Sequence, residues 1–182
     1  MKRIFTTLAI TDSIALAAAF ALGCWSRWAE QPSTNLYLLH FLVGLFTAVG
    51  TILVHCLIFT YLLGTGRWVR EVTLAYQLPD EPNYRRTRDL KRQTYPLALT
   101  AMLLTIAAAA AGGGAQLQGW PWQIHFALSI TTLVVNYTIF AIEYRKICIN
   151  TATLDAVLVD VDRVRAARGL PPNATALAEE AV

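Results

Sequence analysis

The chain alternates between long apolar stretches without a charged residue and shorter stretches rich in charge. No Asp, Glu, Lys or Arg occurs from Gln31 to Gly66 or from Gln93 to Ile142, gaps of 36 and 50 residues. A membrane-spanning helix needs about 20 mostly apolar residues. Together with the apolar N-terminal stretch, these gaps predict four spans, at about residues 4–28, 36–63, 95–115 and 122–142. The runs lack period-2 alternation, which favours helices over a β-barrel.

The composition supports the same class of protein. Of the 182 residues, 55% are hydrophobic and 15% are charged, against about 25% charged in an average soluble domain. The mean hydropathy is +0.45, which excludes a disordered chain. The three cysteines have neither zinc nor redox spacing, and no hydrolase, metalloprotease, phosphate-loop or dinucleotide motif occurs. Whether the protein is an enzyme is therefore left open by the sequence.

The basic residues predict the orientation of the spans. Fourteen of the 15 lysines and arginines precede the first span, lie between the second and third, or follow the fourth; Arg27 is the exception. By the positive-inside rule, both termini and the loop 64–94 are cytoplasmic. This distribution also accounts for the net charge of +3 without a nucleic-acid partner.

The predicted fold is an all-α integral membrane protein of the inner (cytoplasmic) membrane. Its four transmembrane helices form an up-down-up-down bundle over residues 1–148, and a cytoplasmic C-terminal helix belongs to a tail over 149–182. Gly64-Thr65-Gly66 is expected to end the second span, and 67–77 to form a short interfacial helix. After the fourth span an apolar stripe could pack on the 64–94 loop or pair with a second copy. Its members are Ile147, Leu154, Leu158 and Val161.

The first span has a competing interpretation. Ala21-Leu22-Gly23-Cys24 partly matches a signal peptide with a lipid-attachment cysteine, so processing at Cys24 is an alternative. Asp12 interrupts the apolar region that such a peptide requires. The orientation of the later spans is the same in either case.

Two of the spans carry matching stripes of small and polar residues on one helix face. The stripe on the second span consists of His40, Gly44, Thr47, Thr51 and His55; the stripe on the fourth consists of His125, Ser129, Thr132 and Asn136. Such stripes face a bundle interior and not lipid. Leu39-His40-Phe41 and Ile124-His125-Phe126 also echo each other, a weak sign of an internal repeat.

His40 and His125 fall at matching depth, each about 5–6 Å below the outer end of its helix. Two neutral imidazoles facing each other across a bundle can ligate haem iron from both sides, and Gly44 and Ser129 leave room for the macrocycle. The arrangement resembles the four-helix membrane b-type cytochromes in these histidines. It departs from their two-haem members, because three histidines in all permit one haem b at most. The alternative is that both histidines bond to water, headgroups or neighbouring helices.

Asp12, His55 and Asn136 form a second, inner layer, about 9–12 Å from the cytoplasmic end. Asp12 is expected to bond to His55 directly or through one water, since an unpaired carboxylate in a membrane is costly. Such a couple could handle protons or be only structural. Glu143 is assigned to an interfacial charge cluster with Arg145 and Lys146.

Three functions therefore remain in view. The first is a small membrane subunit that binds haem b and acts in electron transfer or sensing. The second is a cofactor-free accessory or scaffold subunit of a larger membrane complex. The third is a homo-oligomer that handles protons or ions. The only partner common to all three is the lipid bilayer.

Overall fold

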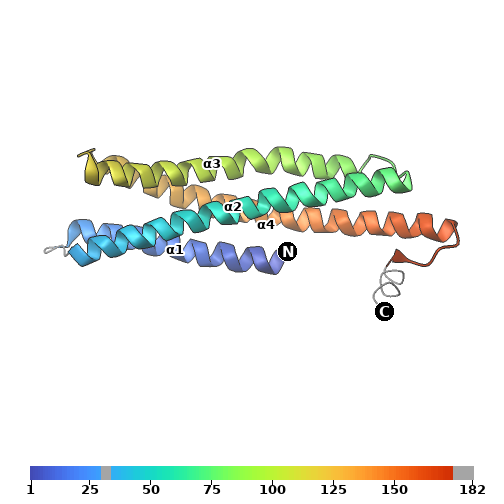
Figure 1. The fold of residues 1–182 in the computed structure, drawn as a ribbon, viewed down its shortest axis with the longest axis horizontal. Coiled ribbons are helices and arrows are strands. Elements are labelled where there is room, and N and C mark those ends of the chain that lie inside the picture. Colours follow the sequence, from blue (N-terminus) through green and yellow to red (C-terminus); the bar gives the residue numbers. More distant parts are fainter. Residues whose placement is uncertain (30–33, 174–182) are drawn as a thin grey trace. The chain divides into compact units, whose positions relative to one another are not determined.

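The computed structural model describes residues 1–29 and 34–173, and within these ranges the chain is helical with no strand. The helices are α1 (Lys2–Trp28), α2 (Thr34–Tyr76), α3 (Asn83–Leu117) and α4 (Trp122–Ala167) (Figure 1). All four are long and apolar enough to cross a membrane, so the predicted all-helical character and the four candidate spans are confirmed. Residues 30–33, between the first two predicted spans, and residues 174–182 of the predicted tail lie outside the described ranges.

Three helices extend beyond their predicted spans. α2 continues through Gly64-Thr65-Gly66 to Tyr76, and α3 begins at Asn83, so the prediction that the glycines end a helix was wrong. A glycine inside a helix costs only about 1 kcal/mol, which tertiary packing can offset. At Gly66 an added Cβ would lie 2.9 Å from Lys91 Nζ. The glycine therefore provides the space in which the lysine side chain packs.

The helices divide into two compact units. Unit 1 consists of Met1–Ile58 and Tyr95–Tyr144, and unit 2 of Phe59–Thr94 and Arg145–Val182. Hence α2, α3 and α4 each contribute residues to both units. This division differs from the predicted boundary at 148/149, because the segment 59–94 groups with the C-terminal part of α4.

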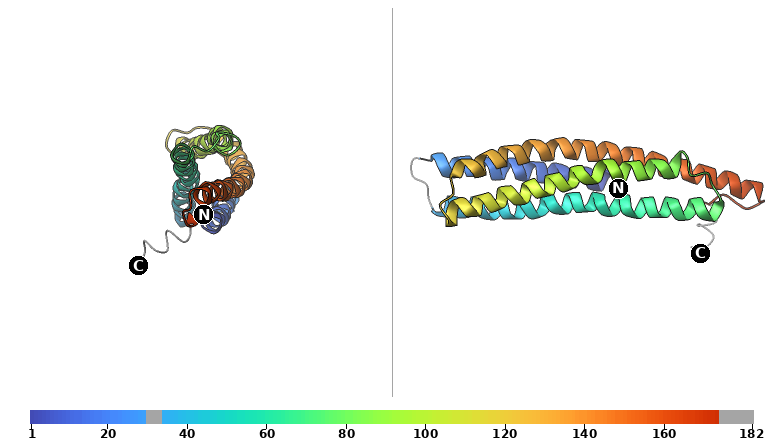
Figure 2. Two further views of the ribbon diagram at one scale, coloured as in Figure 1. Left: turned by 90° about the vertical axis from the view of Figure 1, so that its right-hand side faces the viewer. Right: turned by 90° about the horizontal axis from the view of Figure 1, so that it is seen from above.

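Unit 1 packs segments of all four helices side by side (Figures 1 and 2). Alanines of α3 such as Ala98 and Ala101 are fully buried, and such small side chains let helices approach closely. Phe5 packs edge-to-face on Phe140, with ring centroids 6.4 Å apart. Many large apolar side chains of this unit stay exposed, Phe46 to 74%, as expected of a surface that faces lipid.

Unit 2 has its own small apolar core. Val69, Val157 and Val161 are buried together, and Val72, Tyr76, Leu78, Tyr84 and Leu154 pack against them. The apolar stripe that follows the fourth span was predicted to pack on residues 64–94 or on a second copy. Its members Leu154 and Val161 pack on the 64–94 segment. Asn83 Nδ2 donates to Asp160 Oδ2 at 3.0 Å, and Arg165 Nη1 donates to the Tyr76 hydroxyl at 3.2 Å.

Candidate functional site

His40 of α2 and His125 of α4 lie next to each other inside unit 1, as their matching depths predicted. Their ring centroids are 6.1 Å apart, and the ring planes make an angle of 61°. Both side chains are half-buried. Two imidazoles from different helices thus share one small region of the bundle.

Backbone hydrogen bonds fix which nitrogen of each ring carries the proton. His40 Nδ1 donates to the Ala19 carbonyl at 3.1 Å, and His125 Nδ1 donates to the Ala108 carbonyl at 2.9 Å. Because a carbonyl only accepts, each neutral ring is protonated at Nδ1 and has its lone pair on Nε2. Among the described residues neither Nε2 has a hydrogen-bond partner. Metal-ligating histidines are commonly held in this way.

A glycine of the neighbouring helix lies beneath each ring. An added Cβ would come within 2.8 Å of His40 Cε1 at Gly23, and within 3.0 Å of His125 Cε1 at Gly112. At Gly44, one turn beyond His40, an added Cβ would meet no atom within 4 Å. The His40 ring is therefore closely packed on a glycine of α1, and the His125 ring on a glycine of α3.

The matching stripes of the sequence correspond to a structural repeat. His40 and His125 are separated by 85 residues in the chain, and so are His55 and Phe140, whose rings stack with centroids 5.0 Å apart. The carbonyls that accept from His40 and His125, of Ala19 and Ala108, are 89 residues apart, as are Gly23 and Gly112. The helix pairs α1–α2 and α3–α4 thus carry equivalent histidine sites. Within unit 2, Thr65 and Asn150, also 85 residues apart, share a hydrogen bond of 3.0 Å.

Replacing the two adjacent glycines of α3 by alanine should have opposite effects on stability. Gly113→Ala adds a Cβ in open space and should stabilise the protein by about 0.5–1 kcal/mol through helix propensity. Gly112→Ala displaces the His125 ring and should cost about 1–3 kcal/mol. Thermal unfolding of both variants in one detergent measures the difference. Equal melting temperatures would contradict the close packing of His125 on Gly112.

The inner layer centres on His55, which is fully buried. Its Nδ1 lies 2.8 Å from Glu143 Oε1, and its Nε2 lies 2.9 Å from Asn136 Oδ1. The predicted grouping of His55 with Asn136 is therefore confirmed. The predicted hydrogen bond from Asp12 to His55 is not formed, because both ring nitrogens have other partners.

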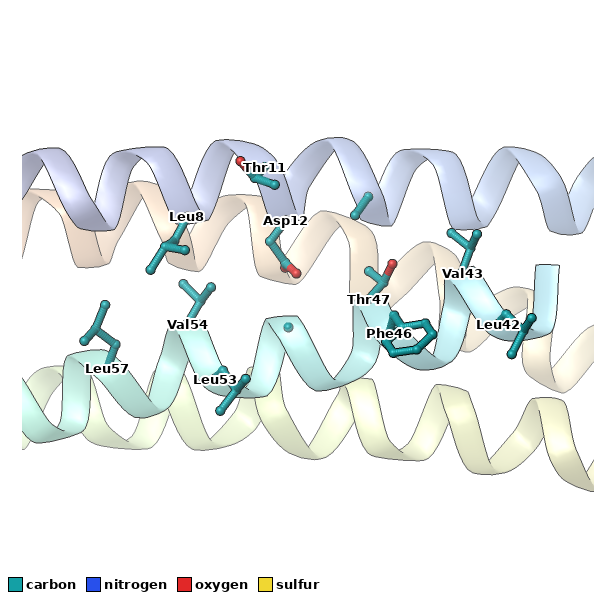
Figure 3. Close-up of a pocket in the computed structure, with 12 residues that line it drawn as sticks. Leu8, Thr11, Asp12, Leu42, Val43, Phe46, Thr47, Leu53, Val54 and Leu57 are labelled. Carbon is teal, nitrogen blue, oxygen red and sulfur yellow. The ribbon is translucent and has the colours of Figure 1, made fainter. Parts of the chain in front are cut away.

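Asp12 interacts with α2 one turn away from His55. The Thr51 hydroxyl lies 2.7 Å from Asp12 Oδ2, and an added Cβ at Gly50 would come within 2.9 Å of Asp12 Oδ1. The carboxyl group points from α1 toward α2, at the wall of a groove of about 660 Å³ (Figure 3). The rest of that wall is almost wholly apolar. Asp12 is buried and bonded across the helix interface.

Glu143 is the functional candidate that sequence reasoning missed. It is fully buried, whereas we expected an interfacial charge cluster with Arg145 and Lys146. Its position at the start of a basic segment suggests a surface residue. The available signal was its spacing of seven residues from Asn136, which places both on one helix face and extends the polar stripe of α4 by two turns.

No group of three or more His, Cys, Asp or Glu side chains in the described part of the chain is arranged to hold a metal ion. Comparison with known proteins finds no matching protein family, no matching curated protein and no matching solved structure. The function must accordingly be argued from the site.

Proposed function

We propose that His40 and His125 bind one haem b, and that the protein is an electron-transfer or haem-sensing subunit of the inner membrane. The observation that carries this proposal is the facing pair of rings with both Nδ1 atoms bound to carbonyls. The side chains that would hold the haem are these two imidazoles, whose ring centroids lie 6.1 Å apart. Each would offer its Nε2 lone pair as a ligand while Nδ1 stays bonded to a carbonyl.

The surroundings of the pair also fit a haem. The macrocycle supplies four equatorial nitrogens, so two protein ligands are enough. An added Cβ at Gly44, one turn from His40, would meet no atom within 4 Å, and Ser129 is the equivalent small residue of α4. When bound, the haem would supply one-electron chemistry, and the two imidazoles and their burial would tune its potential. His55 is unsuited as a further ligand because both of its nitrogens are engaged.

An absorption spectrum tests the proposal directly. The protein is produced in cells supplied with haem precursor, purified in detergent, and measured before and after reduction with dithionite. We expect a low-spin b-type spectrum with about one haem per chain. A colourless protein, also after addition of haemin to the purified sample, would overturn the proposal and favour a cofactor-free subunit of a larger membrane complex.

The orientation that we propose places both termini and the segment around Asn83 in the cytoplasm. In a variant whose native cysteines are replaced by serine, a cysteine at Gln118 should react with an impermeant thiol reagent added to intact cells. A cysteine at Asn83 should react only after the membrane is opened. The opposite pattern of labelling would reverse the topology.

A further inference from the structure

The hydrogen bonds of Asn136 determine the protonation of one nitrogen of His55. Asn136 Nδ2 lies 2.8 Å from the Thr132 carbonyl and 3.3 Å from the Thr105 hydroxyl. A backbone carbonyl can only accept, so the amide nitrogen must face Thr132 and the amide oxygen must face His55. The oxygen also only accepts. His55 Nε2 is therefore an N–H donor to Asn136.

This tautomer requires a shared proton on the opposite side of the ring. If Nε2 alone were protonated, the lone pair of Nδ1 would face the Glu143 carboxylate oxygen at 2.8 Å, and the two would repel. Either Glu143 is protonated and donates to Nδ1, or Nδ1 is protonated and donates to the carboxylate. In both cases the His55–Glu143 pair holds one proton between its facing atoms and has no net charge.

The second carboxyl oxygen of Glu143 has an unused hydrogen-bonding capacity. Glu143 Oε2 is buried and has no hydrogen-bond partner among the described residues. A buried polar atom without a partner is costly to retain and usually has a ligand, a water or a function that explains it. This oxygen is thus the atom of the pair that is free to receive a proton or a bridging water.

We propose that the His55–Glu143 pair is a buried proton-binding site that takes up a second proton at Glu143 Oε2 on acidification. In the product, the imidazolium keeps both of its N–H bonds, to Asn136 and to Glu143 Oε1, and the carboxyl group is neutral. The proton comes from water and no other bond changes. This activity does not depend on the haem proposal.

The charges around the pair favour this uptake. α1 contributes Asp12, α2 contributes His55 and α4 contributes Glu143, whereas α3 contributes Thr105, whose hydroxyl does not titrate in this range. With Asp12 ionised, the layer has a net charge of −1 when the His55–Glu143 pair holds only the shared proton. Uptake of the second proton at Glu143 Oε2 makes the layer neutral. A neutral layer is the less costly state inside a membrane.

Infrared difference spectroscopy of the purified protein, without haem, between neutral and acidic pH tests the proposal. We expect the carbonyl band of a protonated carboxyl group to appear on acidification, or to change frequency if Glu143 Oε1 already carries the shared proton at neutral pH. The band should shift in heavy water. Glu143→Gln should remove the band, whereas Glu71→Gln, at an exposed carboxylate, should retain it. Asp12→Asn separates the signal of Asp12 from that of Glu143. Labelling glutamate with ¹³C at the side-chain carboxyl separates glutamate bands from aspartate bands in the unchanged chain, and the loss in Glu143→Gln assigns the band to Glu143.

Asn136 acts as a positioning residue, since it fixes the tautomer of His55 without receiving the proton. Asn136→Leu should therefore move the midpoint pH of the Glu143 band, which a merely structural substitution would not do. A Glu143 carboxyl signal that stays constant across the accessible pH range would overturn the proposal and leave a static hydrogen bond. Because the infrared test uses protein without haem, neither result bears on the haem proposal, which the absorption spectrum tests separately.

Discussion

His40→Ala and His125→Ala are each expected to abolish the low-spin b-type spectrum completely. Each removes one of the two imidazoles that would hold the haem, and the described part of unit 1 offers no third free imidazole near the pair. His55→Gln should keep the spectrum, because the nitrogens of His55 bond to Glu143 and Asn136. The haem content and spectrum of each purified variant measure the effect.

Chemical rescue sharpens the same experiment. Free imidazole added to either alanine variant should occupy the vacated volume and restore the low-spin spectrum, since the missing group is then supplied in solution. Gly113→Ala serves as a matched control that alters α3 beside the site without contacting a ring. A full spectrum in either histidine variant without imidazole would show that the haem has other ligands.

Glu143→Leu is expected to lower the free energy of unfolding by about 3–5 kcal/mol, because removal of one partner leaves His55 buried with Nδ1 unpaired. Glu143→Gln should cost less, since an amide can still bond to the ring. Unfolding in a mixed-micelle titration, followed by circular dichroism, provides the measurement.

Glu71→Ala is the control for that experiment. Glu71 forms an ion pair with Arg67 in which the two side chains are 60% and 80% exposed, and such pairs contribute about 0–1 kcal/mol. Equally small losses at both positions would mean that Glu143 is a surface residue, as its sequence neighbours indicate.

The sequence predicted the parts of the structure that depend on hydropathy and helical periodicity. The four helices, the meeting of His40 with His125 and the contact of His55 with Asn136 follow from apolar windows and from residues on one helix face. The ends of α2 and α3 did not, because a hydropathy window stops where polar residues begin, whereas these helices continue. Within unit 2 the burial of Val69 with Val157 and Val161 stabilises residues that appeared to form a loop.

The sequence also did not predict which side chains contact the buried carboxyl groups of Asp12 and Glu143. Depth along a helix axis placed Asp12 and His55 in one layer, but depth does not specify the rotation of each helix about its axis. That rotation directs Asp12 to Thr51 and brings Glu143 to His55. Two residues at the same depth are therefore neighbours only when their helix faces also meet.

The 85-residue repeat separates a symmetric part of unit 1 from an asymmetric part. The outer layer has histidine at both related positions, 40 and 125. In the inner layer the counterpart of His55 is Phe140, and the counterpart of Glu143 is Ile58, which is also fully buried. A symmetric dimer of α1–α2 pairs would bring two histidines and no Glu143 into this layer, and a dimer of α3–α4 pairs would bring two glutamates and no histidine. The chain joins two unlike halves and so gives the imidazole a single carboxyl partner. The inner layer depends on this difference between the halves, whereas the outer layer does not.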